Sequence, residues 1–242
     1  MILNCGMCYH TSVKLKANDF IKVVNAPFPR QDEYLEFNHA NGFAHPNLAV
    51  LSTDYGRSIN LYNWGLIPFW VKDWNAAIKL RNQTLNARSE EVFNKPSFRD
   101  SILKRRCVIP VTGFFEWKHI GKEKIPYYIH PKEHPVFYLA GIYSHWNDPS
   151  TRDELTTFSI LTGAANEMMS DIHNSAKRMP LMLNRELIDD WISQDLSPVS
   201  IKELMNPCDD NIMAAYTISK DISNPKVNSD VESITDKIEY GN

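Results

Sequence analysis

The order of apolar and polar positions along the chain predicts a strand-rich protein. Segments rich in Val, Ile, Tyr, Phe and Thr alternate with turn residues, a pattern typical of consecutive antiparallel strands. A turn centred on Gly121 is expected to join two of them. The predicted strands cover 48–52, 59–67, 106–117, 125–130, 136–143, 155–163 and 212–218.

Helix-capping residues predict short helices between these strands. Ser and Asn side chains accept hydrogen bonds from the first free N–H groups of a helix. The predicted helices cover 18–24, a short stretch from Ser89, 97–104, 164–171, 184–193 and 198–205. Tight turns between consecutive strands imply an antiparallel-rich sheet, closed or sharply curved, with helices outside it. We therefore predict a single α+β domain.

Composition places the protein among ordinary globular domains. The chain has 242 residues, of which 43% are hydrophobic and 23% charged, and it can bury a sizeable core. No apolar run is long enough to span a bilayer, and the first residues lack a signal-peptide pattern. The cysteines show no spacing typical of a disulfide framework. These features predict a cytoplasmic protein, nucleoid-associated if it is bacterial.

Charge is unevenly distributed, although the formal net charge is only −3. Between Lys79 and Arg106 there are eight Lys and Arg residues against three acidic ones. Such a basic stretch is consistent with a local contact surface for phosphates. A solvated helix face would give the same pattern.

One carboxylate stands inside the predicted strand 106–117. Glu116 lies between Phe115 and Trp117, where burial of a charge costs several kcal/mol unless the group is paired or protonated. A displaced pKa would make Glu116 a general acid or base. Strand alternation allows a second interpretation, in which Glu116 points to solvent and its neighbours face the core.

Cys8 is a candidate nucleophile if it becomes the first residue of the chain. An N-terminal cysteine carries an amine of pKa about 8 and a thiol of pKa about 8.5 on adjacent carbons. The amine can form an imine with an aldehyde, and the thiol can close a five-membered thiazolidine ring onto it. The alternative is half of a zinc site, because Cys5 and Cys8 form a CxxC pair.

Two further motifs carry side chains suited to catalysis or phosphate binding. Asn86 and Arg88 precede a predicted helix within the basic stretch, and Arg88 could hold a phosphate in a bidentate manner. His173 titrates near neutral pH and could transfer protons. Each of these residues could instead have a purely structural role. The same holds for Arg178, which follows His173 at a predicted helix end and could interact with the helix dipole.

A series of short motifs follows in order along the chain: Met7-Cys8, Trp64-Gly-Leu-Ile-Pro68, Asn86-Ala-Arg88-Ser-Glu90, Gly113-Phe-Phe-Glu-Trp-Lys118, Ala140-Gly141-Ile142, Ile172-His173 and Arg178-Met-Pro180. Taken together, these motifs resemble those of the SRAP family, the SOS-response-associated peptidases. The resemblance extends from Met7 to about Val227. It implies a curved, barrel-like sheet with flanking helices. It also implies a sensor of abasic sites in single-stranded DNA that loses its initiator Met and crosslinks the exposed cysteine to the sugar aldehyde.

The resemblance implies a catalytic role for four residues. Cys8 would supply both amine and thiol, and Asn86 would hold the cysteine backbone or the opened sugar. Glu116 would move protons during imine formation and ring closure. His173 would assist opening of the sugar ring and reversal of the crosslink.

The resemblance also implies a set of DNA contacts. Arg88 and Arg178 match phosphate-binding positions, although three inserted residues, 175–177, precede Arg178. Trp70 and Pro46 match apolar groups that wedge beside the lesion. His10 takes the place of an Arg, because the family usually begins Cys-Gly-Arg.

The resemblance also divides the chain into three parts. Residues 1–7 are expected to be removed or to lie before the true start, so that the mature protein begins at Cys8. Residues 8–227 would form the SRAP-like domain, and 228–242 a polar C-terminal tail that we expect to be loosely held. The chemistry requires neither cofactor nor metal. We expect a monomer that binds single-stranded DNA with abasic sites, has replication-fork proteins as candidate partners and has no membrane association.

Two other functions fit the same residues. In one, Cys8 and His173 form the nucleophile and base of a thiol peptidase or hydrolase, acting on itself or in trans. In the other, the basic stretch and Trp70 make a non-catalytic binder of single-stranded DNA.

Overall fold

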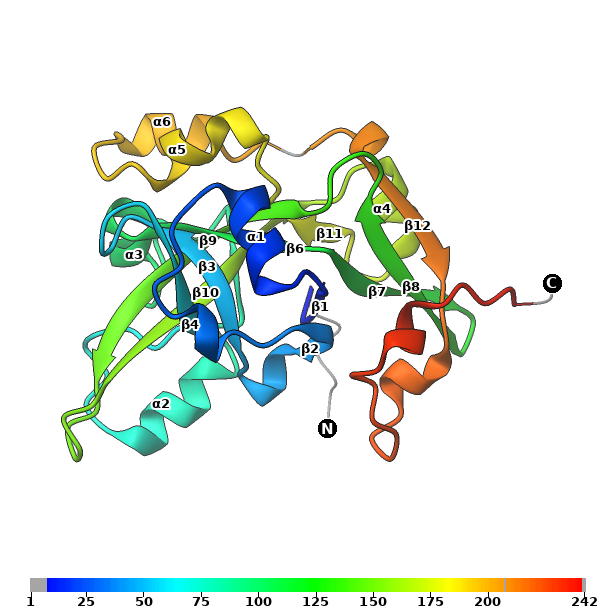
Figure 1. Cartoon of the computed structure of the whole chain (residues 1–242), viewed down its shortest axis with the longest axis horizontal. Coiled ribbons are helices and arrows are strands. Elements are labelled where there is room, and N and C mark those ends of the chain that lie inside the picture. Colours follow the sequence, from blue (N-terminus) through cyan, green and yellow to red (C-terminus); the bar gives the residue numbers. More distant parts are fainter. Residues whose placement is uncertain (1–7, 207, 241–242) are drawn as a thin grey trace.

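Two β-sheets and a set of short helices make up residues 8–206 and 208–240, the part that this computed structural model describes (Figure 1). The strands are β1 (His10–Val13), β2 (Phe37–Asn41), β3 (Asn47–Ser52), β4 (Ser58–Trp64), β5 (Asn86–Arg88), β6 (Arg106–Val111), β7 (Gly113–Ile120), β8 (Glu123–Pro131), β9 (Phe137–Asn147), β10 (Glu154–Ala164), β11 (Arg178–Pro180) and β12 (Met213–Thr217). The helices are α1 (Ala17–Val24), α2 (Trp74–Arg81), α3 (Arg99–Lys104), α4 (Glu167–Ile172), α5 (Ile188–Ile192) and α6 (Pro198–Glu203).

One sheet closes into a barrel. Strand β10 pairs in parallel with β4 and antiparallel with β9, and the chain of pairings β4–β3–β6–β9 returns to it. Strands β5 and β11 extend the pairing of β10 beyond this ring. The rings of Trp64 on β4 and Phe158 on β10 are fully buried and stacked 6.0 Å apart. The predicted α+β class and the curved, barrel-like sheet are therefore confirmed.

The second sheet has the order β12-β8-β7-β1-β2. Its centre is β7, which pairs with β8 on one side and with β1 on the other, and β1 pairs in turn with the edge strand β2. Strands β7 and β8 form the hairpin predicted around Gly121, whose φ of 59° lies in the left-handed region that glycine adopts without strain. This sheet carries Glu116 on β7 and places Cys8 two residues before the start of β1.

Two predicted elements differ in the structure. The predicted strand 106–117 is two strands, because the chain leaves the barrel after Val111 and enters the second sheet at Gly113. The helix expected from Ser89 is a series of turns. The N–H of Ser89 donates to the carbonyl of Thr162 on β10, which continues the sheet pairing of β5 instead of starting a helix.

Helix α2 was not predicted from the sequence. Asp73 caps it, with Oδ1 accepting from the N–H of Ala76 at 2.8 Å. Asn166 caps α4 and Ser197 caps α6, each side chain accepting from a backbone N–H in the first turn of its helix. No helix in the described residues has the length and apolar character needed to cross a membrane.

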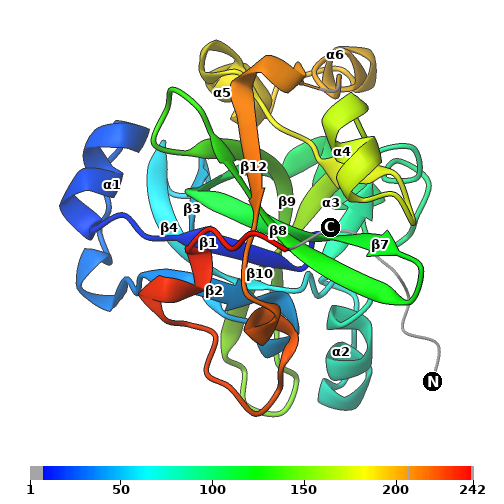
Figure 2. The same ribbon diagram turned by 90° about the vertical axis from the view of Figure 1, so that its right-hand side faces the viewer.

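The segment after Ser223 is packed against the second sheet, so the expectation of a loosely held tail is wrong. Asp230 Oδ1 accepts from the backbone N–H groups of Asn38 and His39 at 2.7 and 3.1 Å, which satisfies donors on edge strand β2. Ile234 is buried in a cluster with Phe115. Figure 2 shows this C-terminal segment, in red, running beside β1 and β2.

Candidate functional site

Cys8 lies between the two sheets. Its side chain is buried, with 1% of its surface exposed. Its backbone carbonyl accepts from Asn86 Nδ2 at 3.0 Å. Asn86 belongs to β5 and pairs with Ile160 of β10, so this hydrogen bond fastens the start of β1 to the barrel. The structure thus brings together two residues that the sequence analysis singled out 78 positions apart.

Glu116 is buried, and the interpretation that it points to solvent is wrong. It lies on the same face of β7 as Phe114, whose ring packs 5.9 Å from Phe137 of the barrel. On the opposite face, Phe115 packs with Ile234 from the C-terminal segment, so both faces of β7 are covered. The structure leaves 5% of Glu116 exposed.

Burial controls the protonation state of Glu116. It raises the pKa of this carboxyl from 4.5 to about 8, and a hydrogen bond from the N–H of Trp117 offsets only part of the effect. Among the described residues, Glu116 Oε1 has no hydrogen-bond partner. Glu116 is therefore largely a neutral acid at pH 7, able to donate a proton and to take one back.

His173 faces Glu116 from the end of α4. Its Nδ1 lies 2.9 Å from the carbonyl oxygen of Arg178, which can only accept, so Nδ1 carries the ring proton. Burial lowers the pKa of His173, which keeps the ring neutral at pH 7. Its unprotonated Nε2 then faces Glu116 Oε2 at 3.9 Å. The two groups can exchange a proton through a substrate hydroxyl held between them.

The thiol of Cys8 is protonated in this environment. Burial raises its pKa, and the negative charge of ionised Glu116 raises it further. The sulfur donates a weak hydrogen bond to the carbonyl of His10 at 3.8 Å. A reaction at this sulfur therefore needs a base close by, and Glu116 lies near enough to influence the thiol electrostatically.

Asn174 fastens the histidine to the strand that carries Glu116, a function that the sequence analysis did not detect. Its Nδ2 donates to the carbonyl of His119 at 2.8 Å, and its Oδ1 accepts from the N–H of the same residue at 3.0 Å. Next to it, Lys118 contacts Asp171 of α4 at 2.6 Å. The sequence shows only that an Asn follows the candidate histidine. Its two hydrogen bonds to the main chain of His119 are evident only in the structure.

Replacing Asn174 by alanine is expected to lower the free energy of unfolding by about 1–3 kcal/mol, because it leaves a backbone donor and acceptor of His119 without these bonds. Urea denaturation measures this change. Asp171→Asn is the control, since it weakens only an exposed ion pair, worth about 0–1 kcal/mol. Equal losses in the two variants would contradict the anchoring role.

The two candidate phosphate ligands differ in their freedom to move. Arg178 is held in a bidentate pair with Glu90, both distances being 2.9 Å, and it also donates to the carbonyl of Thr162. Only 12% of its side chain is exposed. The side chain of Arg88 is 50% exposed, and its nearest acidic partner, Glu91, is 4.0 Å away. Arg88 is the more accessible cation of the two.

His10 is not a cation in this structure. Its Nδ1 lies 2.7 Å from Nε2 of His39, and its ring meets the ring of Trp117 edge-on. Burial, together with His39, lowers the pKa of His10 to about 3. Any phosphate contact by His10 would therefore be that of a neutral donor, unlike the arginine expected at this position.

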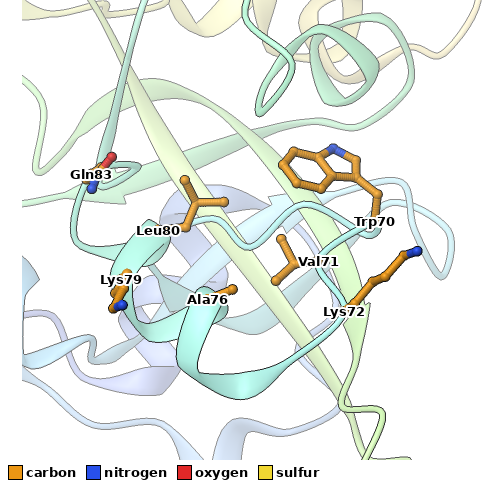
Figure 3. A pocket seen from close by; sticks show the side chains of 7 residues that line it. All are labelled: Trp70, Val71, Lys72, Ala76, Lys79, Leu80 and Gln83. Carbon is orange, nitrogen blue, oxygen red and sulfur yellow. The ribbon is translucent and has the colours of Figure 1, made fainter.

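The candidate wedge residues lie towards α2. Trp70 is 46% exposed in the loop before this helix, where it lines a pocket (Figure 3). Pro46 is half-buried directly before β3, and its carbonyl accepts from the N–H of Trp64 at 3.0 Å. Within the described part of the chain, no group of three His, Cys, Asp or Glu could hold a metal ion. Cys5, the other half of the alternative zinc pair, lies outside the described residues.

Comparison with known families gives a match over almost the whole chain. The family model described as SOS response associated peptidase (SRAP) matches residues 7–225. The chain belongs to the SRAP family. Residues Cys8, Asn86, Glu116 and His173 all fall inside the matched region.

Several curated SRAP relatives are named abasic site processing proteins. YoqW of Bacillus subtilis is 37% identical over 184 residues, which cover 75% of this chain and 79% of that protein. YoaM of the same organism is 36% identical, with 75% and 78% covered. HMCES of Gallus gallus is 34% identical over 162 residues, or 59% of this chain and 46% of that protein. The chain thus spans less than half the length of this vertebrate relative.

Solved structures confirm the fold. A crystal structure of a protein from Bacteroides thetaiotaomicron is 38% identical and has a TM-score of 0.88, with 96% of this chain and all of that chain covered. A protein from Bordetella bronchiseptica has a TM-score of 0.74 at 20% identity, covering 88% and 100% of the two chains. At this low identity, the similarity to the Bordetella protein shows a shared fold and nothing about function.

Proposed function

We propose that this protein recognises abasic sites in single-stranded DNA and traps them covalently through Cys8 at a freed amino terminus. The naming of its relatives as abasic site processing proteins supports the substrate. The observation that carries the mechanism is the buried Glu116, with a pKa of about 8, beside Cys8 and facing His173. Such a carboxyl can serve both as acid and as base at neutral pH.

The first step joins the amine to the sugar. An abasic deoxyribose in its ring-opened form carries an aldehyde, and the α-amine of Cys8 adds to this carbon to give a carbinolamine. Protonated Glu116 donates a proton to the carbinolamine hydroxyl, which leaves as water, so that an iminium ion forms and Glu116 is left ionised. During ring opening His173, neutral with its unprotonated Nε2 facing Glu116, accepts the proton of the sugar C1′ hydroxyl and returns it to the ring oxygen as the bond between C1′ and that oxygen breaks.

The second step closes the ring. Glu116, now ionised, takes the proton of the Cys8 thiol, and the sulfur adds to the iminium carbon while the C=N electron pair moves onto nitrogen. The product is a thiazolidine, with one water lost overall and Glu116 returned to its acid form. Asn86 holds the carbonyl of Cys8 at 3.0 Å, which keeps amine and thiol oriented on the same carbon of the sugar.

This chemistry requires removal of the residues before Cys8, because an internal cysteine has no free amine. Residues 1–7 lie outside the described part of the chain. The family match begins at residue 7, which supports a mature protein that starts with Cys8. The peptidase activity in the family's name would, on this proposal, be self-cleavage at that bond.

Crosslinking to an abasic oligonucleotide tests the proposal directly. Protein produced with Cys8 as its first residue is expected to form an adduct that survives SDS electrophoresis. A chain that retains residues 1–7 is expected to form none, and intact mass shows whether it has retained them. The same adduct from the unprocessed chain, or none from the chain starting at Cys8, would exclude the mechanism.

The two alternatives have less support from the geometry. A thiol peptidase of the nucleophile–base type needs a thiolate, and nucleophilic cysteines generally have a lowered pKa. The pKa of the Cys8 thiol is raised instead. A non-catalytic binder would give no SDS-resistant adduct, so the crosslinking experiment separates it from our proposal.

A further inference from the structure

Tyr9 directly follows the candidate nucleophile and has no role in the mechanism above. Its carbonyl accepts from the N–H of Gly42 at 2.7 Å, and its ring lies 4.9 Å from that of Phe43. The side chain is half-buried. Within the described residues, its hydroxyl makes no hydrogen bond. Packing therefore holds the ring in place, while the hydroxyl remains available to a ligand.

Strand pairing brings Tyr9 to the face of β7 that carries Glu116. Strands β1 and β7 run side by side and antiparallel, with Thr11 opposite Phe114 (Figure 2). Continued by two residues towards the start of the chain, this register leads to Tyr9 on one strand and Glu116 on the other. Residues that face each other across antiparallel strands point to the same side of the sheet. Tyr9 thus approaches the site from the strand next to Glu116.

The electrostatic environment of the phenol agrees with this placement. Burial raises the pKa of the Tyr9 hydroxyl, the negative charge of ionised Glu116 raises it further, and the cation of Arg88 offsets part of the rise. The hydroxyl thus lies within reach of the charges of the catalytic carboxyl and of the accessible arginine. It stays protonated at neutral pH, as a neutral group that can both donate and accept a hydrogen bond.

This position suits one particular group of an opened abasic sugar. The proposed function brings the aldehyde carbon, C1′, to Cys8 and Glu116, and Arg88 is the accessible cation for a phosphate. Apart from the aldehyde and the two phosphate esters, the opened 2-deoxyribose has one polar group, the hydroxyl that ring opening frees on C4′. It is attached to the carbon between the two ester-bearing carbons. A neutral phenol between an acid and a phosphate-binding cation fits this hydroxyl.

We infer that the Tyr9 hydroxyl forms a hydrogen bond with the C4′ hydroxyl of the ring-opened sugar and so turns C1′ towards Cys8. This inference rests on the proposed function, which places the abasic sugar at Cys8. An abasic residue has no base, so few groups are left by which a protein can orient its sugar. A contact at C4′, made by the residue next to the nucleophile, fixes the sugar at a second point and keeps the aldehyde within reach of the amine.

Two oligonucleotides that differ in one hydroxyl test this contact without the crosslinking chemistry. In one strand a 1,3-linked glycerol residue replaces the abasic sugar, and its central hydroxyl stands for the one on C4′. In the other, 1,3-propanediol keeps the same three backbone carbons and lacks the hydroxyl. Neither residue carries an aldehyde. Fluorescence anisotropy with the protein that starts at Cys8 is expected to give a Kd about three- to tenfold lower for the glycerol strand, the effect of one hydrogen bond.

Tyr9→Phe assigns this difference to the phenol. The variant keeps the ring against Phe43 and removes a hydroxyl that has no partner in the described part of the protein, so the fold should tolerate it. It is expected to bind the two strands equally, as the wild-type protein binds the propanediol strand. Tyr55→Phe is the matched control, because it removes an exposed phenol hydroxyl in the turn between β3 and β4. It should retain the full preference for the glycerol strand.

Three results would overturn the inference. Equal affinity of the wild-type protein for the two strands would show that the central hydroxyl is not contacted. An undiminished preference in Tyr9→Phe would assign the contact to another side chain. A loss of affinity by the same factor for both strands in Tyr9→Phe would place the phenol against a phosphate instead. None of these outcomes depends on adduct formation, so failure of this contact and failure of the crosslinking mechanism remain distinguishable.

Discussion

Replacing Cys8 by alanine is expected to abolish the SDS-resistant adduct with abasic single-stranded DNA. The variant keeps a free α-amine when it starts at residue 8, so it can still form an imine, but it has no sulfur to close the ring. An imine hydrolyses on denaturation, whereas a thiazolidine is a five-membered ring formed by an intramolecular step that proximity favours strongly. Denaturing electrophoresis measures the loss.

Chemical reduction separates the two steps in this variant. Borohydride reduces an imine to a stable amine, so Cys8→Ala is expected to give an adduct only when borohydride is present. Binding to a strand that carries a tetrahydrofuran residue, which has no aldehyde, in place of the lesion should be nearly unchanged, because the Cys8 side chain is buried and supplies no charge. A stable adduct from Cys8→Ala without reductant would show that another group performs the crosslink.

The motifs predicted the residues of the site, but not how the fold arranges them. Cys8, Asn86, Glu116 and His173 come from the segment before β1, from β5, from β7 and from the end of α4, which are far apart in sequence. Their meeting depends on closure of the barrel through the pairing of β9 with β10 and on the hydrogen bond from Asn86 to the backbone of Cys8. Local patterns contain no information on such long-range pairings.

The orientation of Glu116 shows why local reasoning left two answers open. Alternation in a strand places Phe115 and Glu116 on opposite faces, and a single sequence does not reveal which face is covered. In this structure both faces of β7 are covered, because Ile222 and Ile234 from the C-terminal segment pack over Phe115. The tail that we expected to be loosely held is therefore part of what encloses β7 and raises the pKa of the carboxyl on its other face.

Helix α2 is a second element whose formation could not be predicted from the local sequence pattern. Its exposed face carries Trp74 and Ile78, so the apolar pattern does not mark a simple buried stripe. The helix is recognised in the structure by its Asp73 cap and by the contact of Ala77 with a small core that includes Trp146.

Glu116→Gln is expected to slow adduct formation by about 100-fold or more, which is the usual effect of losing a general acid or base. Glutamine has nearly the same shape but can neither donate nor accept the catalytic proton. In the wild-type protein the rate should fall above a pH of about 8, where Glu116 loses its proton. The variant should lack this descending limb. Single-turnover crosslinking across pH 5–10 measures both, and a normal rate in Glu116→Gln would assign proton transfer elsewhere.

The same substitution should change how stability depends on pH. The folded-state pKa of Glu116 is raised from 4.5 to about 8, so its favourable contribution is complete below pH 4.5 and is lost as the pH rises to 8. Over that interval the full-length wild-type chain is expected to lose roughly 4 kcal/mol that the variant keeps, at about 1.4 kcal/mol per pKa unit. Urea denaturation at pH 5 and pH 8.5 gives this difference. Parallel stability curves for the two proteins would mean that Glu116 ionises normally in the folded state, and the acid–base role would then lose its physical basis.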